Sequence, residues 1–239
     1  MYLPAHFAET RPEELHRVLR EHPLGILIAN GPEGLDANHI PFLFDPPGES
    51  TAQGDSTVQG DSVPSGGDCG RLTGHVARAN PVWQHCPTGT EVLVVFRGAE
   101  GYISPNWYPS KHEAHRQVPT WNYEVVHAHG RITIHDDERF LRGLLARLTR
   151  THEAGEPRPW KMGDAPADYL SERLREIVGI EIVITKLVGK RKLSQNKEAR
   201  DQQGAVSALR ERGDAALAEA MVKAAPVPTH TTPSTASRS

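Results

Sequence analysis

Segments of strand length follow one another closely along this chain, and their order restricts the fold more than any other feature. Residues 24–30 are apolar, and residues 35–45 resume after the turn Gly31-Pro32-Glu33-Gly34, which predicts a hairpin. About seven such segments occur in hairpin-like succession, with helices between and after them. A doubly wound sheet needs a regular alternation of strands and helices instead. The sequence therefore predicts a mainly β fold with flanking helices, built as a mostly antiparallel barrel.

The remaining strands of this predicted barrel lie between residues 71 and 187. Residues 91–97 are apolar and β-branched, and residues 98–104 are predicted to be their hairpin partner. Residues 118–135 predict one long strand, and the alternating residues 180–187 predict the last one. The segment 71–77 supplies a further strand between the first hairpin and these.

Helices are predicted where capping residues precede an apolar helical period. Thr10 to Glu13 fits a capping box with Pro12 in the first turn. Asp136-Asp137 precedes a run of leucines at helical spacing and predicts a second helix. Asn196 is expected to cap a last helix that ends near residue 223.

The domain organisation follows from these elements and from two stretches of biased composition. One domain is predicted over residues 1–195, followed by a C-terminal helix over 196–224. Residues 46–70 are rich in Gly, Ser, Asp and Pro and predict a flexible insertion, which is either a solvated loop or a functional lid. The Thr-, Ser- and Pro-rich residues 225–239 predict a disordered tail.

Composition restricts the class of protein further. The net charge of −3 does not favour a polyanionic partner, although a local basic patch or a dimer groove leaves contact with DNA open. Two cysteines, Cys69 and Cys86, make neither a disulfide framework nor a zinc site. No secretory signal and no apolar run of bilayer length occurs, so we expect a cytoplasmic protein without membrane contact.

Three segments are too polar and aromatic to be ordinary core strands: residues 38–42, 74–81 and 118–130. Polar and aromatic groups along extended segments suit a flat, hydrogen-bonding ligand such as a flavin. His75 and Arg78 end a strand just before a predicted helix start, and such a turn offers cationic and backbone donors to a phosphate. An exposed arginine beside a surface histidine is the alternative interpretation.

Aromatic side chains concentrate between residues 102 and 123. Such side chains stack on a planar ligand, fill a dimer interface or form a simple core cluster, and the sequence leaves all three open. The residues are Tyr102, Trp107, Tyr108, Trp121 and Tyr123.

The sequence lacks the motifs of metal sites, phosphate-binding loops, hydrolases and common DNA-binding domains. His127 and His129 face the same side of a strand, but no cysteine or carboxylate motif completes a metal site, so no metal is predicted. The sequence has no Gly-rich phosphate loop, no hydrolase elbow and no helix-turn-helix or zinc-finger pattern. No catalytic acid or base stands out, and whether the protein is an enzyme stays open.

Six motifs in order resemble the PaiB family, whose members are described as FMN-binding negative transcriptional regulators. The resemblance runs from about residue 1 to 210, and only the segment 46–70 and the tail depart from it. It implies an FMN-binding split β-barrel and a homodimer with FMN at the subunit interface. The motifs are Met1-Tyr2-Leu3-Pro4-Ala5-His6-Phe7, Asn38-His39-Ile40-Pro41-Phe42, Gly74-His75-Val76-Ala77-Arg78-Ala79-Asn80-Pro81, Tyr102-Ile103-Ser104-Pro105-Asn106-Trp107-Tyr108, Pro119-Thr120-Trp121-Asn122-Tyr123 and Lys192-Leu193-Ser194-Gln195-Asn196.

The resemblance also implies which residues contact the cofactor. Those expected along the flavin ring are Asn38, His39, Ile40 and Pro41. Those expected at the phosphate end are His75, Arg78, Ala79 and Asn80. Those expected from the partner subunit are Trp107, Trp121 and Asn122, and those expected to close the site are Lys192, Ser194 and Gln195.

Function is therefore expected to centre on bound FMN. The first hypothesis is a homodimeric FMN-binding regulator of the PaiB type. The alternative is an FMN-dependent oxidoreductase that acts on a small molecule, in which the flavin carries the electrons. Haem in place of FMN is a further option, because histidines are plentiful.

Overall fold

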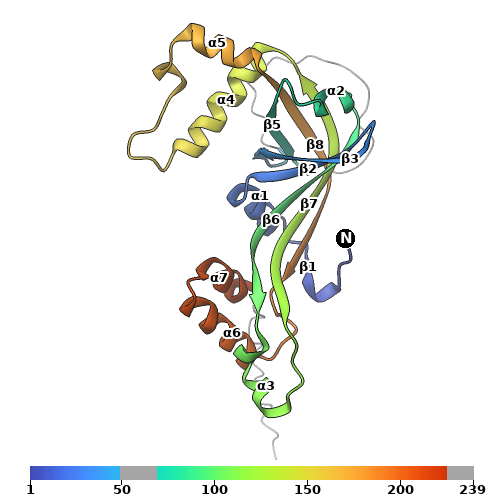
Figure 1. Cartoon of the computed structure of the whole chain (residues 1–239), viewed down its shortest axis with the longest axis vertical. Coiled ribbons are helices and arrows are strands. Elements are labelled where there is room, and N and C mark those ends of the chain that lie inside the picture. The colour runs from blue at the N-terminus through green and yellow to red at the C-terminus, as the bar shows by residue number, and fades with distance from the viewer. Residues whose placement is uncertain (49–68, 225–239) are drawn as a thin grey trace, which may run out of the picture. The chain divides into compact units, whose positions relative to one another are not determined.

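An eight-stranded sheet organises the described part of the chain, residues 1–48 and 69–224 of this computed structural model (Figure 1). The strand order is β3-β2-β6-β7-β8-β5-β4, and β1 pairs with β8. β2 pairs antiparallel with β3 and β6, and β5 pairs antiparallel with β4 and β8. The predicted mainly β fold is confirmed. The strands are β1 Ala8–Glu9, β2 Leu24–Gly31, β3 Gly34–Pro41, β4 Leu43–Asp45, β5 Arg71–Ala77, β6 Glu91–Ile103, β7 Thr120–His135 and β8 Ile177–Lys192.

Helices flank this sheet, and their ends follow local chemistry. The Asp137 side chain accepts a hydrogen bond from the Phe140 amide at 2.7 Å and caps α4 as predicted. The capping box expected at Thr10 is wrong: Pro12 takes the first helical position of α1, so Arg11 is the N-cap, and its amide donates to Glu9 instead. The helices are α1 Pro12–Glu21, α2 Val82–His85, α3 Pro109–Ala114, α4 Glu138–Glu153, α5 Ala167–Arg175, α6 Ala199–Glu211 and α7 Ala215–Ala224.

The chain divides into two compact units, each with its own apolar core. Among the described residues, the larger unit comprises 9–48, 69–98 and 124–190, and the smaller unit comprises 1–8, 99–123 and 191–224. The largest fully buried side chains of the larger core come from its strands, from α1 and from the link between β3 and β4: Leu19, Leu27, Phe42, Leu72, Phe96, Ile132, Ile180, Ile182 and Ile184. Those of the smaller core are Ile103, Tyr108 and Leu193, and they pack with α6 and α7.

The predicted hairpin at residues 98–104 is wrong, because β6 runs on without a turn to Ile103. Two glycines in this stretch of β6 serve close packing. A Cβ atom on Gly98 would lie 3.0 Å from the Cβ of Glu124, and one on Gly101 would lie 2.8 Å from Cδ2 of Leu217. Both glycines are extended residues whose missing side chain makes room for a neighbour.

The single helix expected over residues 196–224 is two helices. α6 begins after Glu198 rather than at Asn196, and the chain turns at Gly213, whose φ of +84° suits glycine. Most of the predicted insertion at 46–70, namely residues 49–68, and the predicted tail at 225–239 lie outside the described residues. Within the described ranges, no helix combines the length and the apolar character needed to span a bilayer.

Candidate functional site

Two of the predicted segments meet in the larger unit, although about 35 residues separate them in sequence. The Asn80 side-chain amide donates to the Asn38 side-chain carbonyl at 2.6 Å. A Cβ atom on Gly74 would lie 3.1 Å from the Pro41 carbonyl oxygen, so the backbones approach closely where β5 passes the end of β3. We call residues 38–41 together with residues 75–80 the β3–β5 junction.

The faces of the junction differ in what they offer a ligand. His39, Pro41 and Ala79 are exposed, and Asn38 and Asn80 are half-buried. Ile40 is only 3% exposed and belongs to the core of the larger unit, because alternate residues of a strand point to opposite faces. The side chain of Ile40 is therefore unavailable to line a ligand ring, and only its backbone remains for that role.

Arg78 is already engaged within the protein. Its guanidinium forms a two-pronged ion pair with the Asp136 carboxylate, at 2.9 and 2.5 Å. It also donates to the carbonyl oxygens of Arg175 at 2.6 Å and Ile177 at 3.1 Å. The hydrogen bond from Arg78 lowers the pKa of Asp136, and the same bond raises the pKa of Arg78. A phosphate can use the charge of Arg78 only if Asp136 gives way.

Trp83 and Asn80 hold the turn between β5 and α2. The indole Nε1 of Trp83 donates to the Arg78 carbonyl at 3.0 Å, and the Arg78 guanidinium lies 5.9 Å from the centre of the indole ring. The Asn80 side-chain oxygen accepts the Val82 amide at 2.9 Å. Sequence reasoning missed Trp83 and Asp136 here. A tryptophan just inside a predicted helix start is a weak signal for such a role, and nothing in the sequence pairs Asp136 with Arg78.

His75 carries a buried nitrogen that the described residues leave unsatisfied. Its Nδ1 has no hydrogen-bond partner among them, and burial lowers the pKa of the ring, which favours neutral imidazole. Buried polar atoms are nearly always paired with protein, water or a ligand. The junction thus fits a cofactor at His75 and its asparagines, whereas its arginine fits only after an exchange of partners.

The predicted residues of the smaller unit form a separate, mostly buried network. Asn122, 1% exposed, donates to Ser194 Oγ at 2.9 Å and to the sulfur of Met221 at 3.4 Å. The buried Tyr108 hydroxyl lies 3.3 Å from the same Ser194 oxygen. Asn122 and Ser194 are therefore committed to each other within one protomer.

Lys192 and Gln195 bond to their own surroundings. The Lys192 ammonium donates to the Thr120 hydroxyl and to the Trp121 carbonyl. Gln195 accepts the Leu193 amide at 2.7 Å and donates to the Arg191 carbonyl at 2.5 Å, which ties the end of β8 to the loop after it. The loop is sharply bent, since Ser194 has a φ of +66°.

Tyr102 and Trp121 form the exposed aromatic group of the smaller unit, and the half-buried Trp107 lies beside Tyr102 and packs against the core. The ring centres of Trp107 and Trp121 each lie 6.5 Å from that of Tyr102 in edge-to-face geometry. Trp121 is 56% exposed and Tyr102 is 46% exposed. Of the alternatives for the aromatic residues, packing in the core holds for Tyr108 and in part for Trp107, and it does not hold for Tyr102 and Trp121.

Comparison with known proteins identifies the family. Residues 1–186 match the family model described as "Putative FMN-binding domain". An uncharacterised Aspergillus fumigatus protein is 34% identical across 89% of this chain and 92% of its own length. The "Protease synthase and sporulation protein PAI 2" of Bacillus subtilis is 27% identical across 87% of this chain and 89% of its own length.

A solved structure shares the fold. The flavocytochrome Anf3 of Azotobacter vinelandii superposes with a TM-score of 0.50 and 14% identity, over 77% of this chain and 69% of that one. This likeness supports the predicted split barrel with flanking helices. Because the family model covers more than half of the chain and spans both segments of the β3–β5 junction, the chain belongs to the FMN-binding PaiB family, whose cofactor is FMN.

Proposed function

We propose that the protein is a homodimeric FMN-binding regulator whose flavin lies on the β3–β5 junction. The observation that carries this proposal is the meeting of the two motif segments through Asn38 and Asn80. Amide side chains and free backbone groups at a strand end suit the hydrogen-bonding edge of an isoalloxazine ring. The unpaired Nδ1 of His75 supports the same placement, since a polar atom of the cofactor would satisfy it.

The phosphate of FMN is proposed to compete with Asp136 for Arg78. Both partners are more than a third exposed, at 38% and 48% of their side-chain surfaces, so exchanging one anion for another costs little. A phosphate carries more charge than a carboxylate and accepts the same two-pronged hydrogen bonds. Asp136 then holds the arginine in place when the flavin is absent and yields it when the flavin binds.

The homodimer is proposed from the exposed aromatic group. Tyr and Trp are enriched where protein surfaces associate, and the side chains of Tyr102 and Trp121 are exposed and lie in edge-to-face contact. In the proposed dimer, Trp107 and Trp121 of one protomer approach the flavin bound to the other. Asn122 has no part in this contact, because its amide is buried within its own protomer.

The regulatory role rests on likeness to the Bacillus subtilis protein, whose name refers to protease synthesis and sporulation. The net charge of −3 argues against strong non-specific DNA binding. We therefore propose that regulation is indirect. The redox state of the flavin, or the presence of flavin in its site, changes a surface of the protein to which a partner macromolecule binds.

An FMN-dependent oxidoreductase is the second candidate, and His75 favours it. A neutral imidazole with a free ring nitrogen beside the proposed flavin site can donate or accept a proton as a reduced flavin reacts. Anaerobic addition of NADH or NADPH tests the enzyme: multiple turnovers of flavin reduction and reoxidation with a small-molecule acceptor support it, and an unchanged flavin spectrum counts against it.

Titration of the purified chain with FMN, followed by flavin fluorescence, tests the proposed site. Replacing Asn38 or Asn80 with alanine is expected to weaken binding about tenfold, since each removes hydrogen-bonding groups from the junction. Asn196→Ala is the matched control, because Asn196 is exposed and lies in the smaller unit. Equal FMN affinity in all three variants would show that the β3–β5 junction does not bind FMN.

A further inference from the structure

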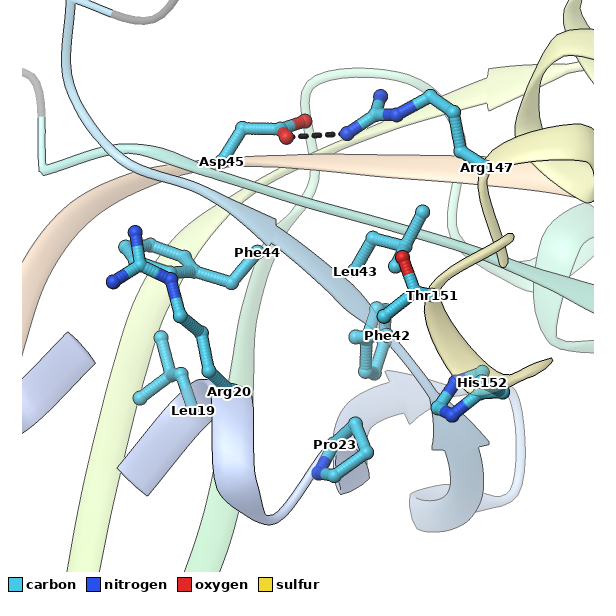
Figure 2. Close-up of a pocket in the computed structure, with 10 residues that line it drawn as sticks. All are labelled: Leu19, Arg20, Pro23, Phe42, Leu43, Phe44, Asp45, Arg147, Thr151 and His152. Carbon is cyan, nitrogen blue, oxygen red and sulfur yellow. Dashed lines mark hydrogen bonds and ion pairs between the residues drawn. The ribbon is translucent and has the colours of Figure 1, made fainter. Parts of the chain in front are cut away.

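A cavity lies in the larger unit, where α1, β4 and α4 come together (Figure 2). Its volume is about 290 Å³, close to the lower limit of roughly 300–1,000 Å³ for small-molecule pockets. None of the residues assigned to the flavin contributes to its wall. The lining residues are Leu19, Arg20, Pro23, Phe42, Leu43, Phe44, Asp45, Arg147, Thr151 and His152.

The wall of this cavity is apolar where it is deepest. Leu19, Phe42 and Leu43 are buried and belong to the cores of the larger unit, so they form a fixed surface. Figure 2 shows the side chains of Phe42 and Leu43 on the side of Thr151 and His152, and the Phe44 ring on the other side, next to the Arg20 guanidinium. Such a surface suits a flat apolar group of one ring.

The two arginines that line the cavity, Arg147 and Arg20, differ in whether a carboxylate pairs with them. Arg147 forms an ion pair with Asp45, so its charge is compensated (Figure 2). Arg20, at the end of α1, has no carboxylate partner among residues 1–48 and 69–224, and its guanidinium lies 5.5 Å from the centre of the Phe44 ring. One uncompensated cation thus stands at the mouth of an apolar cavity, and it is held there by stacking rather than by an ion pair.

We propose that this cavity binds a small monocarboxylate whose body is a single apolar ring. The ring fills the space beside Phe42 and Leu43, and the carboxylate accepts hydrogen bonds from Arg20. A second negative charge is disfavoured, because Asp45 occupies the other guanidinium and repels a further anion. The inference is independent of the flavin site, since the two sites share no residue.

Binding of 4-fluorophenylacetate to the full-length protein, with its FMN as purified, tests the proposal by fluorine NMR. We expect saturable binding of this probe and binding at least tenfold weaker for the neutral 4-fluorophenylacetamide, which keeps the ring and loses the charge. Arg20→Gln is expected to weaken the acid about tenfold and to leave the amide unchanged. Arg139→Gln, which removes an exposed charge from the other end of α4, is expected to have no effect.

A filling variant checks the location of the probe. Thr151→Trp places a large ring at the exposed rim of the cavity and is expected to abolish binding of the acid, while an unchanged flavin spectrum and unfolding midpoint show that the protein is folded. Absence of saturable binding, equal affinity for acid and amide, or full affinity in Arg20→Gln would each overturn the proposal. Competition between the probe and added FMN would assign the binding to the flavin site instead, and failure of FMN to bind at all would contradict only the proposed function.

Discussion

Asp136→Asn is the most informative single substitution, because it separates two roles for Arg78. Asparagine keeps the shape of aspartate and one acceptor oxygen but loses the charge that now neutralises the guanidinium. If phosphate and Asp136 compete for Arg78, the variant binds FMN more tightly than the parent. If Arg78 only braces the turn between β5 and α2, the variant binds FMN no better.

The size of the effect follows from the exposure of the pair. Both side chains are more than a third exposed, and ion pairs of this kind contribute about 0–1 kcal/mol. FMN no longer has to break the pair in the variant, so its dissociation constant is expected to fall by up to about fivefold. The free energy of unfolding without flavin is expected to fall by no more than about 1 kcal/mol, since Arg78 keeps its bonds to two backbone carbonyls.

Paired titrations with FMN and riboflavin give the decisive measurement. Riboflavin lacks the phosphate, so its affinity is expected to be the same in the parent, in Asp136→Asn and in Arg78→Gln, while Arg78→Gln weakens FMN. Asp168→Asn is the control, because it makes the same charge change at an exposed position of α5. A parallel change in FMN and riboflavin affinity, or weaker FMN binding by Asp136→Asn, would refute the exchange.

Four further perturbations test other parts of the structure. Trp121→Glu is expected to convert the proposed dimer into monomers, measured by light scattering after gel filtration, because a charge enters the exposed aromatic group; a stable dimer would move the interface elsewhere. Asn122→Ala is expected to cost about 1–3 kcal/mol of unfolding free energy in urea, since Ser194 loses a buried partner; a loss below about 0.5 kcal/mol would contradict the buried network. Gly204→Ala is expected to lower the unfolding midpoint, because its Cβ would lie 2.2 Å from the Trp107 carbonyl oxygen, whereas Gly143→Ala has open space and is expected to be neutral or stabilising. Burial lowers the pKa of both His75 and His135, so the unfolded chain binds more protons and stability is expected to fall as the pH drops below about 6.5; a midpoint that is the same at pH 7.5 and 5.5 would show that these rings are not buried as described.

Features set by neighbouring residues could be predicted without a structure. The hairpin of β2 and β3 follows from a turn between two extended runs, and the cap of α4 follows from Asp137 before a leucine period. The family motifs are of the same kind, because each is a short string of residues. Prediction failed at residues 98–104: the expected hairpin partner is a continuation of β6, in which Gly98 and Gly101 make room for Glu124 and Leu217.

Whether an individual site residue is free to contact a ligand depends on partners that are distant in the sequence. Arg78 meets Asp136 across 58 positions, and Asn122 meets Ser194 across 72, so no local pattern could reveal that both are already engaged. The family motif that includes Ile40 also does not predict that this side chain points into the core. Short-range order is encoded in backbone preference and side-chain period, whereas the availability of a charge or an amide depends on which distant group the fold brings within hydrogen-bonding distance.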